Sequence, residues 1–129
     1  MEEIIKSSLI KTEPSKDAIR LAQAIYNTYL QLDNPYLCIP ITRLCLIFDA
    51  KCTKEFLRHL GKLFDELNEP IMAEHFNYKG KKYDWKVLKF CNVEQLKGDK
   101  GNYLDVEINE MFVEAVKESE ADVDPFFIS

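Results

Sequence analysis

Three cations on one predicted helix are the residues of this sequence best placed for chemistry. Lys54, Arg58 and Lys62 follow one another at intervals of four within the helix expected over 53–67. Residues four apart share one helix face, so the three side chains form a row. Such a row can contact nucleic-acid phosphates, and Arg58 can also form two hydrogen bonds to a guanine. The alternative is an ordinary solvated face, since acidic residues lie close by: Glu55, Asp65 and Glu66.

A second group of cations surrounds a glycine in a predicted hairpin. Lys79, Lys81 and Lys82 flank Gly80 between two runs that alternate like strands, at 71–78 and 82–93. These lysines could follow the phosphates of a neighbouring groove. Alternatively, they form a charged hairpin tip that keeps the chain soluble and protects a sheet edge.

The aromatic residues of this hairpin have two possible roles. Tyr83 and Trp85 could stack on the bases of a single strand. Their alternating positions in a strand are more typical of a hydrophobic core, however, and we expect both side chains to be buried there.

No catalytic or metal-binding pattern is visible in the sequence. His59 and His75 lack a serine, cysteine or carboxylate arranged as a nucleophile and base, and no glycine-rich phosphate loop is present. The four cysteines include no C-x-x-C pair and do not match zinc-ligand spacing, so we expect them to be reduced and packed beside the core: Cys38, Cys45, Cys52 and Cys91. The sequence therefore predicts binding rather than catalysis, with no cofactor and no metal.

Length and composition indicate one domain. The chain has 129 residues, of which 47% are hydrophobic, enough to form a single core. Its N-terminus lacks the apolar core of a signal peptide and no run of 18 apolar residues occurs, so we expect a cytoplasmic protein without membrane contact.

Charge is distributed unevenly along the chain. The formal net charge is -5, but residues 51–100 carry 11 basic against 8 acidic groups, whereas residues 101–129 carry 1 against 8. A local basic surface is therefore compatible with the acidic total.

Periodicity and turn signals place these residues on an ordered set of elements. A helix is expected over 15–32, an extended segment at 36–39 and a short helix over 40–48, followed by the helix 53–67 with Thr53 as N-cap. The two strands of the hairpin, a strand at 103–108 and a last helix capped by Asn109 complete the chain. This order predicts an α+β fold of the winged-helix type, with a helix-turn-helix at 40–68 and a β-hairpin wing at 71–93.

The C-terminal segment 119–129 combines acidic residues with an apolar end. Phe126 and Phe127 could insert into a protein partner or a second copy of the chain, or the tail could fold over the basic face of its own domain. A frayed end without a role is the remaining alternative. We therefore predict a domain over 15–118, preceded by a segment at 1–14 that could be flexible and followed by this acidic tail.

Several stretches together resemble a known family. Leu37-Cys38-Ile39-Pro40, Phe56-Leu57-Arg58-His59-Leu60, Tyr83-Asp84-Trp85-Lys86-Val87-Leu88 and Leu104-Asp105-Val106-Glu107-Ile108-Asn109 resemble the N-terminal winged-helix domain of plasmid replication initiators. The resemblance covers about residues 15–118. Initiators of that family normally carry a second winged helix that makes most of the specific DNA contacts, so the resemblance implies that a first domain alone chiefly dimerises.

Together these features predict a small winged-helix protein that binds double-stranded DNA, associated with replication or transcription, and forms a homodimer. Contact would be made through the helix 53–67 and the wing 71–93. The alternative is a protein-interaction or dimerisation module of the same fold that does not bind DNA.

Overall fold

The computed structural model describes residues 14–98, 101–119, 124–126 and 128. The described helices are α2 (Lys16–Leu32), α3 (Ile41–Ile47), α4 (Lys54–Leu67) and α5 (Glu110–Glu118), and the strands are β1 (Tyr36–Pro40), β2 (Ile71–Tyr78), β3 (Lys81–Leu88), β4 (Cys91–Gly98) and β5 (Gly101–Ile108). The α+β class is therefore confirmed. Each predicted helix is present within one or two residues of its expected limits.

Local capping explains where the helices begin. The side-chain oxygens of Ser15, Thr53 and Asn109 accept hydrogen bonds from backbone N–H groups in the first turns of α2, α4 and α5. These bonds satisfy donors that have no partner within the helix. At the other end of α2, Asp33 takes a left-handed conformation with φ of 49° and closes the helix.

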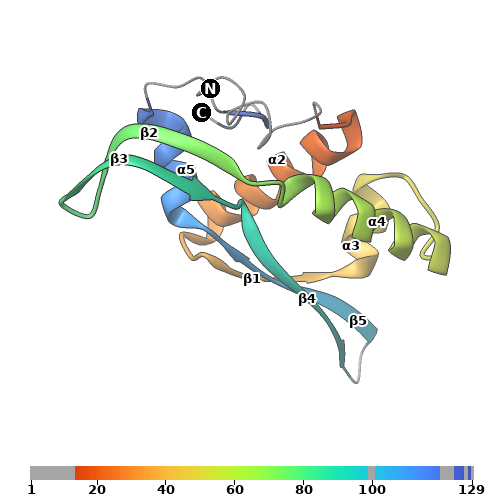
Figure 1. The fold of residues 1–129 in the computed structure, drawn as a ribbon. Helices are drawn as coiled ribbons and strands as arrows, with labels where there is room; N and C mark the ends of the chain where they lie inside the picture. The colour runs from red at the N-terminus through yellow and green to blue at the C-terminus, as the bar shows by residue number, and fades with distance from the viewer. Residues whose placement is uncertain (1–13, 99–100, 120–123, 127, 129) are drawn as a thin grey trace.

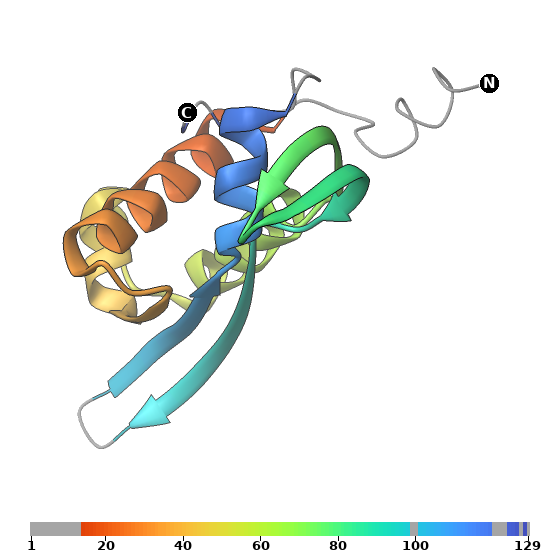
Figure 2. The same ribbon diagram turned by 90° about the vertical axis from the view of Figure 1, so that its left-hand side faces the viewer.

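The strands form two antiparallel sheets (Figure 1). β1, β5 and β4 make a three-stranded sheet in which β5 is central, and β2 with β3 makes a separate two-stranded sheet. The helices α2, α3 and α4 lie on one side of the three-stranded sheet, and α5 lies beside β2 (Figures 1 and 2). β4 and β5 form a hairpin, and β5 also pairs with β1, the strand that follows α2.

One predicted strand is wrong in its extent. The segment 82–93 is two strands, β3 and β4, which belong to different sheets. The break falls at Lys89 and Phe90, whose backbone carbonyls accept hydrogen bonds from the side chain and the backbone N–H of Asn109. The Phe90 ring is fully buried. The segment 71–93 is thus not a single wing, because only 71–88 belongs to the β2–β3 hairpin.

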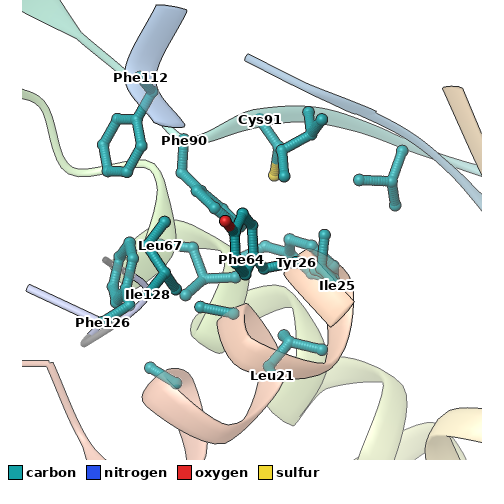
Figure 3. Close-up of a cluster of buried hydrophobic side chains, with 14 of the residues drawn as sticks. Leu21, Ile25, Tyr26, Phe64, Leu67, Phe90, Cys91, Phe112, Phe126 and Ile128 are labelled. Atoms are coloured by element: carbon teal, nitrogen blue, oxygen red, sulfur yellow. The ribbon is translucent and has the colours of Figure 1, made fainter. Parts of the chain in front are cut away.

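A cluster of three phenylalanines lies in the core beside the helices (Figure 3). The Phe90 ring centre lies 5.4 Å from that of Phe112 and 5.3 Å from that of Phe126, in edge-to-face arrangements that favour aromatic packing. Phe126 is only 2% exposed. The expectation that Phe126 inserts into a partner is therefore corrected: its ring packs inside its own domain. Phe127 lies outside the described residues.

Trp85 differs from the sequence expectation. We predicted a core position, but Trp85 is 63% exposed, and its strand neighbour Val87 is 43% exposed. Tyr83 is half-buried and its ring stacks on that of Phe76. The reason is that α5 packs against β2 on one face of the two-stranded sheet, whereas Trp85 and Val87 lie on the exposed face.

The expectation of four reduced cysteines is also wrong in part. Cys45 at the end of α3 forms a disulfide with Cys52, with their Cα atoms 5.8 Å apart. The turn between α3 and α4 returns the chain toward Cys45, and the backbone N–H of Ala50 donates to the Cys45 carbonyl. Cys38 is free and exposed, whereas Cys91 is free and buried.

Replacing Phe126 tests whether the C-terminal segment is part of the core. We expect Phe126→Ala to lower the free energy of unfolding by about 3 kcal/mol, because it removes a buried ring and leaves a cavity. Urea denaturation followed by circular dichroism measures this. Leu46→Ala is the control, since Leu46 is 82% exposed and its loss is expected to change stability by less than about 0.5 kcal/mol. Equal effects of the two variants would contradict the burial of Phe126.

Counting reactive thiols tests the state of the cysteines. Burial raises the pKa of the Cys91 thiol to about 12, so only roughly one such thiol in ten thousand is ionised at pH 8. With iodoacetamide and mass spectrometry we expect one modified cysteine in the native chain, two after unfolding without reductant, and four after reduction. Four modified cysteines in the unfolded, unreduced chain would show that the disulfide is absent.

Candidate nucleic-acid interface

The outer face of α4 carries the predicted cation row. Its apolar residues point into the core and are buried: Phe56, Leu60, Leu63, Phe64 and Leu67. The opposite face is exposed and includes Lys54, Arg58 and Lys62. The amphipathic period of the helix therefore fixes the exposure of all three cations. Glu55 and Asp65 are exposed on this helix as well.

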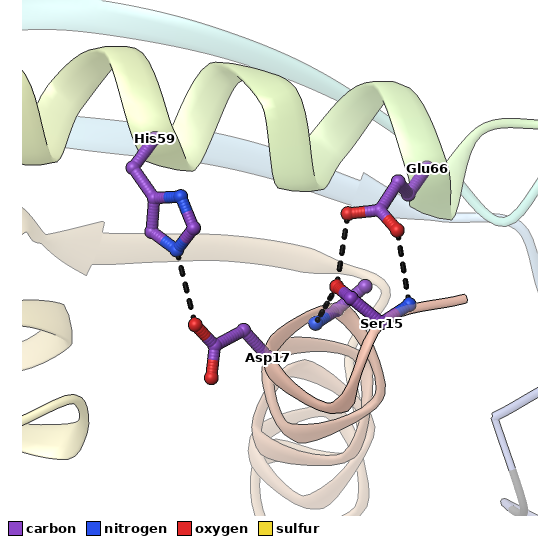
Figure 4. A network of polar contacts seen from close by, with 5 residues as sticks. Ser15, Asp17, His59 and Glu66 are labelled. Atoms are coloured by element: carbon purple, nitrogen blue, oxygen red, sulfur yellow. Dashed lines mark hydrogen bonds and ion pairs between the residues drawn. The ribbon is translucent and has the colours of Figure 1, made fainter.

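Two carboxylates connect α4 to α2 (Figure 4): Glu66 lies on α4 and Asp17 lies on α2. Both carboxylate oxygens of Glu66 accept hydrogen bonds from Ser15, one from its backbone N–H at 2.9 Å and one from its hydroxyl at 3.0 Å. Asp17 lies 3.1 Å from Nε2 of His59. Glu66 and His59 of α4 thus bond to residues at the start of α2, and these bonds orient α4.

The start of α4 is fixed by the turn that precedes it. Thr53 caps the helix by accepting the Phe56 N–H at 3.1 Å, and the disulfide of Cys52 ties the same turn to α3. Lys51 and Lys54 are exposed beside this cap. The N-terminal end of α4 is therefore a positioned and basic part of the surface.

The predicted lysines of the hairpin lie at its tip. Lys79 and Gly80 form the turn between β2 and β3 with positive φ angles of 50° and 76°, a pattern typical of tight hairpin turns. Lys79, Lys81 and Lys82 are exposed. The Lys79 ammonium lies 5.3 Å from the centre of the Tyr78 ring, a cation–π contact.

The two groups of cations do not form one patch. In Figure 1 the tip of the β2–β3 hairpin and the N-terminal end of α4 lie at opposite ends of the molecule. The chain passes from the end of α4 through residues 68–70 into β2. A ligand that touches both groups must therefore extend along the molecule.

The outer face of the three-stranded sheet is acidic, which the sequence reasoning did not single out. Glu94 lies directly opposite Asp105 in the ladder, and Glu107 lies opposite Tyr36. All four side chains are exposed and line a shallow hollow. The Glu107 carboxylate raises the pKa of the Tyr36 hydroxyl, both by its charge and by a hydrogen bond. Like charges in cross-strand contact make this face unsuited to phosphates. The alternation of apolar and acidic residues over 103–108 could have revealed this acidic face.

A second hollow beside α4 is lined mainly by apolar side chains, among them Leu57, Phe64 and Leu104, and Asp65 is its one ionisable residue. Such a lining offers no pair of acid and base groups. Among the described residues, no group of three or more histidine, cysteine, aspartate or glutamate side chains could hold a metal ion. None of the described helices is both long and apolar enough to span a membrane.

Comparison with known proteins adds no relative. No protein-family model, no curated protein and no solved structure matches this chain. The resemblance to plasmid replication initiators therefore stays a prediction.

Proposed function

We propose that this chain is a nucleic-acid-binding protein of the winged-helix type that binds double-stranded DNA through α4. The observation that carries the proposal is the row Lys54, Arg58 and Lys62. All three side chains are exposed, and none of them forms an ion pair within the described part of the chain. Cations that form no ion pair within the protein are available to contact phosphates.

The geometry of α3 and α4 supports the choice of this helix. A helix-turn-helix unit places the N-terminal residues of its second helix against base edges in the major groove. Here the second helix is α4, and its first two turns carry Lys54 and Arg58. In the proposed complex Arg58 reads a guanine, while Lys54 and Lys62 contact phosphates.

The β2–β3 hairpin supplies a second, separate contact. Residues 78–86 hold four lysines and one aspartate. Because the tip lies away from the N-terminal end of α4 (Figure 1), Lys79, Lys81 and Lys82 would contact phosphates farther along the duplex. Binding of this kind is associated with replication or transcription, the role that we propose for the protein.

A protein-interaction or dimerisation module is the second candidate. The observation that favours it is the exposed apolar surface of β3, formed by Trp85 and Val87. Exposed apolar surface of this kind is typical of protein contacts when it is contiguous.

Salt-dependent DNA binding tests the proposal. We expect the triple variant Lys54→Ala, Arg58→Ala and Lys62→Ala to bind labelled double-stranded DNA at least about tenfold more weakly. We also expect the slope of log affinity against log salt to fall by about 2, since the two phosphate contacts of Lys54 and Lys62 are lost. Fluorescence anisotropy at several salt concentrations measures both.

A matched control variant removes three positive charges at sites outside α4. The variant Lys16→Ala, Lys89→Ala and Lys117→Ala changes three exposed lysines outside α4 and is expected to keep most of the affinity. No binding by the unchanged protein at low salt, or equal losses in the two triple variants, would overturn the proposed role of α4.

A further inference from the structure

Two aromatic side chains of the described residues are exposed over more than half of their surface, and they lie on different sheets. Trp85 on β3 is 63% exposed, and Tyr36 on β1 is 66% exposed. A tryptophan this exposed is unusual, because burial of its large ring would stabilise the protein. Trp85 is also the single tryptophan of the chain. The charges around each ring indicate what it could bind.

An interruption of the hairpin turns Trp85 outward. The β2–β3 ladder skips the position of His75, whose φ is positive at 54°. Tyr83 faces inward, where it stacks on Phe76, and the Lys86 ammonium lies 5.5 Å from the centre of the Tyr83 ring. Residues 83 and 86 thus share one face, which regular alternation does not allow. Trp85, next to Lys86, therefore lies on the opposite face, and a backbone conformation uncommon for histidine maintains this arrangement.

Trp85 shares the outer face of the hairpin with two apolar side chains and one lysine. Val87 follows on the same face and is 43% exposed, and Met72 lies opposite Val87 in the ladder. Lys82 is exposed and precedes the inward Tyr83, so it is turned outward. Three residues of a strand span about 10 Å. The phosphates that flank a base on Trp85 can therefore reach the Lys82 ammonium.

Two carboxylates lie close to Trp85 and restrict how a nucleic acid could run. Glu74 is opposite Trp85 in the ladder and half-buried, and Asp84 precedes Trp85 and is exposed. Both repel phosphates, so a bound backbone follows the lysines of the hairpin tip. Bases can lie beside a carboxylate, because their edges carry N–H donors that it accepts.

Charge distinguishes Trp85 from Tyr36 as a place for a polyanion. Tyr36 shares its hollow with the three carboxylates of the acidic sheet face, which repel phosphates. The hairpin over 71–88 instead carries four lysines against two carboxylates. An exposed aromatic ring on a basic element is the combination that binds single-stranded nucleic acids, since bases stack on the ring while cations contact the backbone.

We propose that the outer face of the β2–β3 hairpin binds single-stranded DNA, with one base stacked on Trp85 and a neighbouring phosphate at Lys82. Val87 and Met72 contact the deoxyribose, whose C2′ carries no hydroxyl group and so suits an apolar surface. Duplex DNA does not fit this site, because its bases are paired and stacked on one another. The site is separate from α4 and does not require that α4 bind a duplex.

The fluorescence of Trp85 reports on stacking directly, because the full chain has one tryptophan. A single-stranded thymidine oligomer of about twelve nucleotides is expected to quench its emission by about half or more. An abasic oligomer of the same length and charge offers phosphates without bases. It is expected to bind at least about tenfold more weakly and to leave the emission unchanged.

Variants separate stacking from charge, with the anisotropy of a labelled thymidine oligomer as the measure of affinity. We expect Trp85→Ala to weaken binding by about tenfold or more and Trp85→Phe by less than about threefold, because a phenyl ring still stacks. Tyr36→Ala removes a similarly exposed ring and is expected to change nothing. Lys82→Ala is expected to lower the slope of log affinity against log salt by about 0.7, whereas Lys16→Ala on α2 leaves it unchanged. Thermal unfolding shows that each variant is folded.

Several outcomes would overturn the proposed site. They are unchanged emission with the thymidine oligomer at low salt, equal quenching by the abasic oligomer or by a duplex, and normal binding by Trp85→Ala. Tighter binding of a uridine oligomer would overturn the choice of DNA. Emission that changes with protein concentration alone would assign this face to a second copy of the chain. The triple variant of α4 is expected to keep the quenching, so a failure of duplex binding through α4 can be told apart from a failure of this site.

Discussion

Burial of Phe90 is the constraint on which the division into two sheets depends. The residue lies between β3 and β4, and its ring packs against Phe112 of α5 and against Phe126. Its carbonyl accepts the backbone N–H of Asn109, the residue that caps α5. With the ring in the core and the carbonyl bonded there, the strand direction cannot continue from β3 into β4. The tip of the β2–β3 hairpin therefore projects from the body of the protein (Figure 1), and β4 joins the three-stranded sheet.

This division determines which surfaces are free. The hairpin outside the main sheet exposes Trp85 and the lysines of its tip, while one of its edges is bonded to Ser119 after α5. The main sheet buries its inner residues beneath the helices and exposes Glu94, Asp105 and Glu107 on its outer face. The outer face of the main sheet is thus acidic and the tip of the hairpin is basic, whereas α4 carries both signs on its exposed face. Such a separation can orient an approaching polyanion toward the basic elements.

The contact between α2 and α4 connects the fold to the proposed function. The apolar stripe of α4 is buried, and Glu66 and His59 are bonded to Ser15 and Asp17 at the start of α2. These interactions fix the rotation of α4 about its axis. As a result the face with Lys54, Arg58 and Lys62 is turned outward, which phosphate contact requires.

The sequence by itself determined the elements that depend on neighbours in the chain. Ser15, Thr53 and Asn109 identified three helix starts, because an N-cap bonds to groups only two or three residues away. The spacing of apolar residues identified the faces of α4, since helical periodicity is local. The cation row could therefore be predicted together with its exposure.

Only the tertiary structure decided the features that depend on distant partners. The break at Phe90 requires Asn109, Phe112 and Phe126, which lie 19, 22 and 36 residues later in the chain. Without that break, the alternation of 82–93 indicated one continuous strand and a buried Trp85. The disulfide of Cys45 depends on the path of the turn after α3, which the spacing of seven residues did not reveal. Phe126 was expected at a partner because acidic residues beside an apolar end are typical of docking peptides. Its burial follows from a core that only the assembled helices and sheet create.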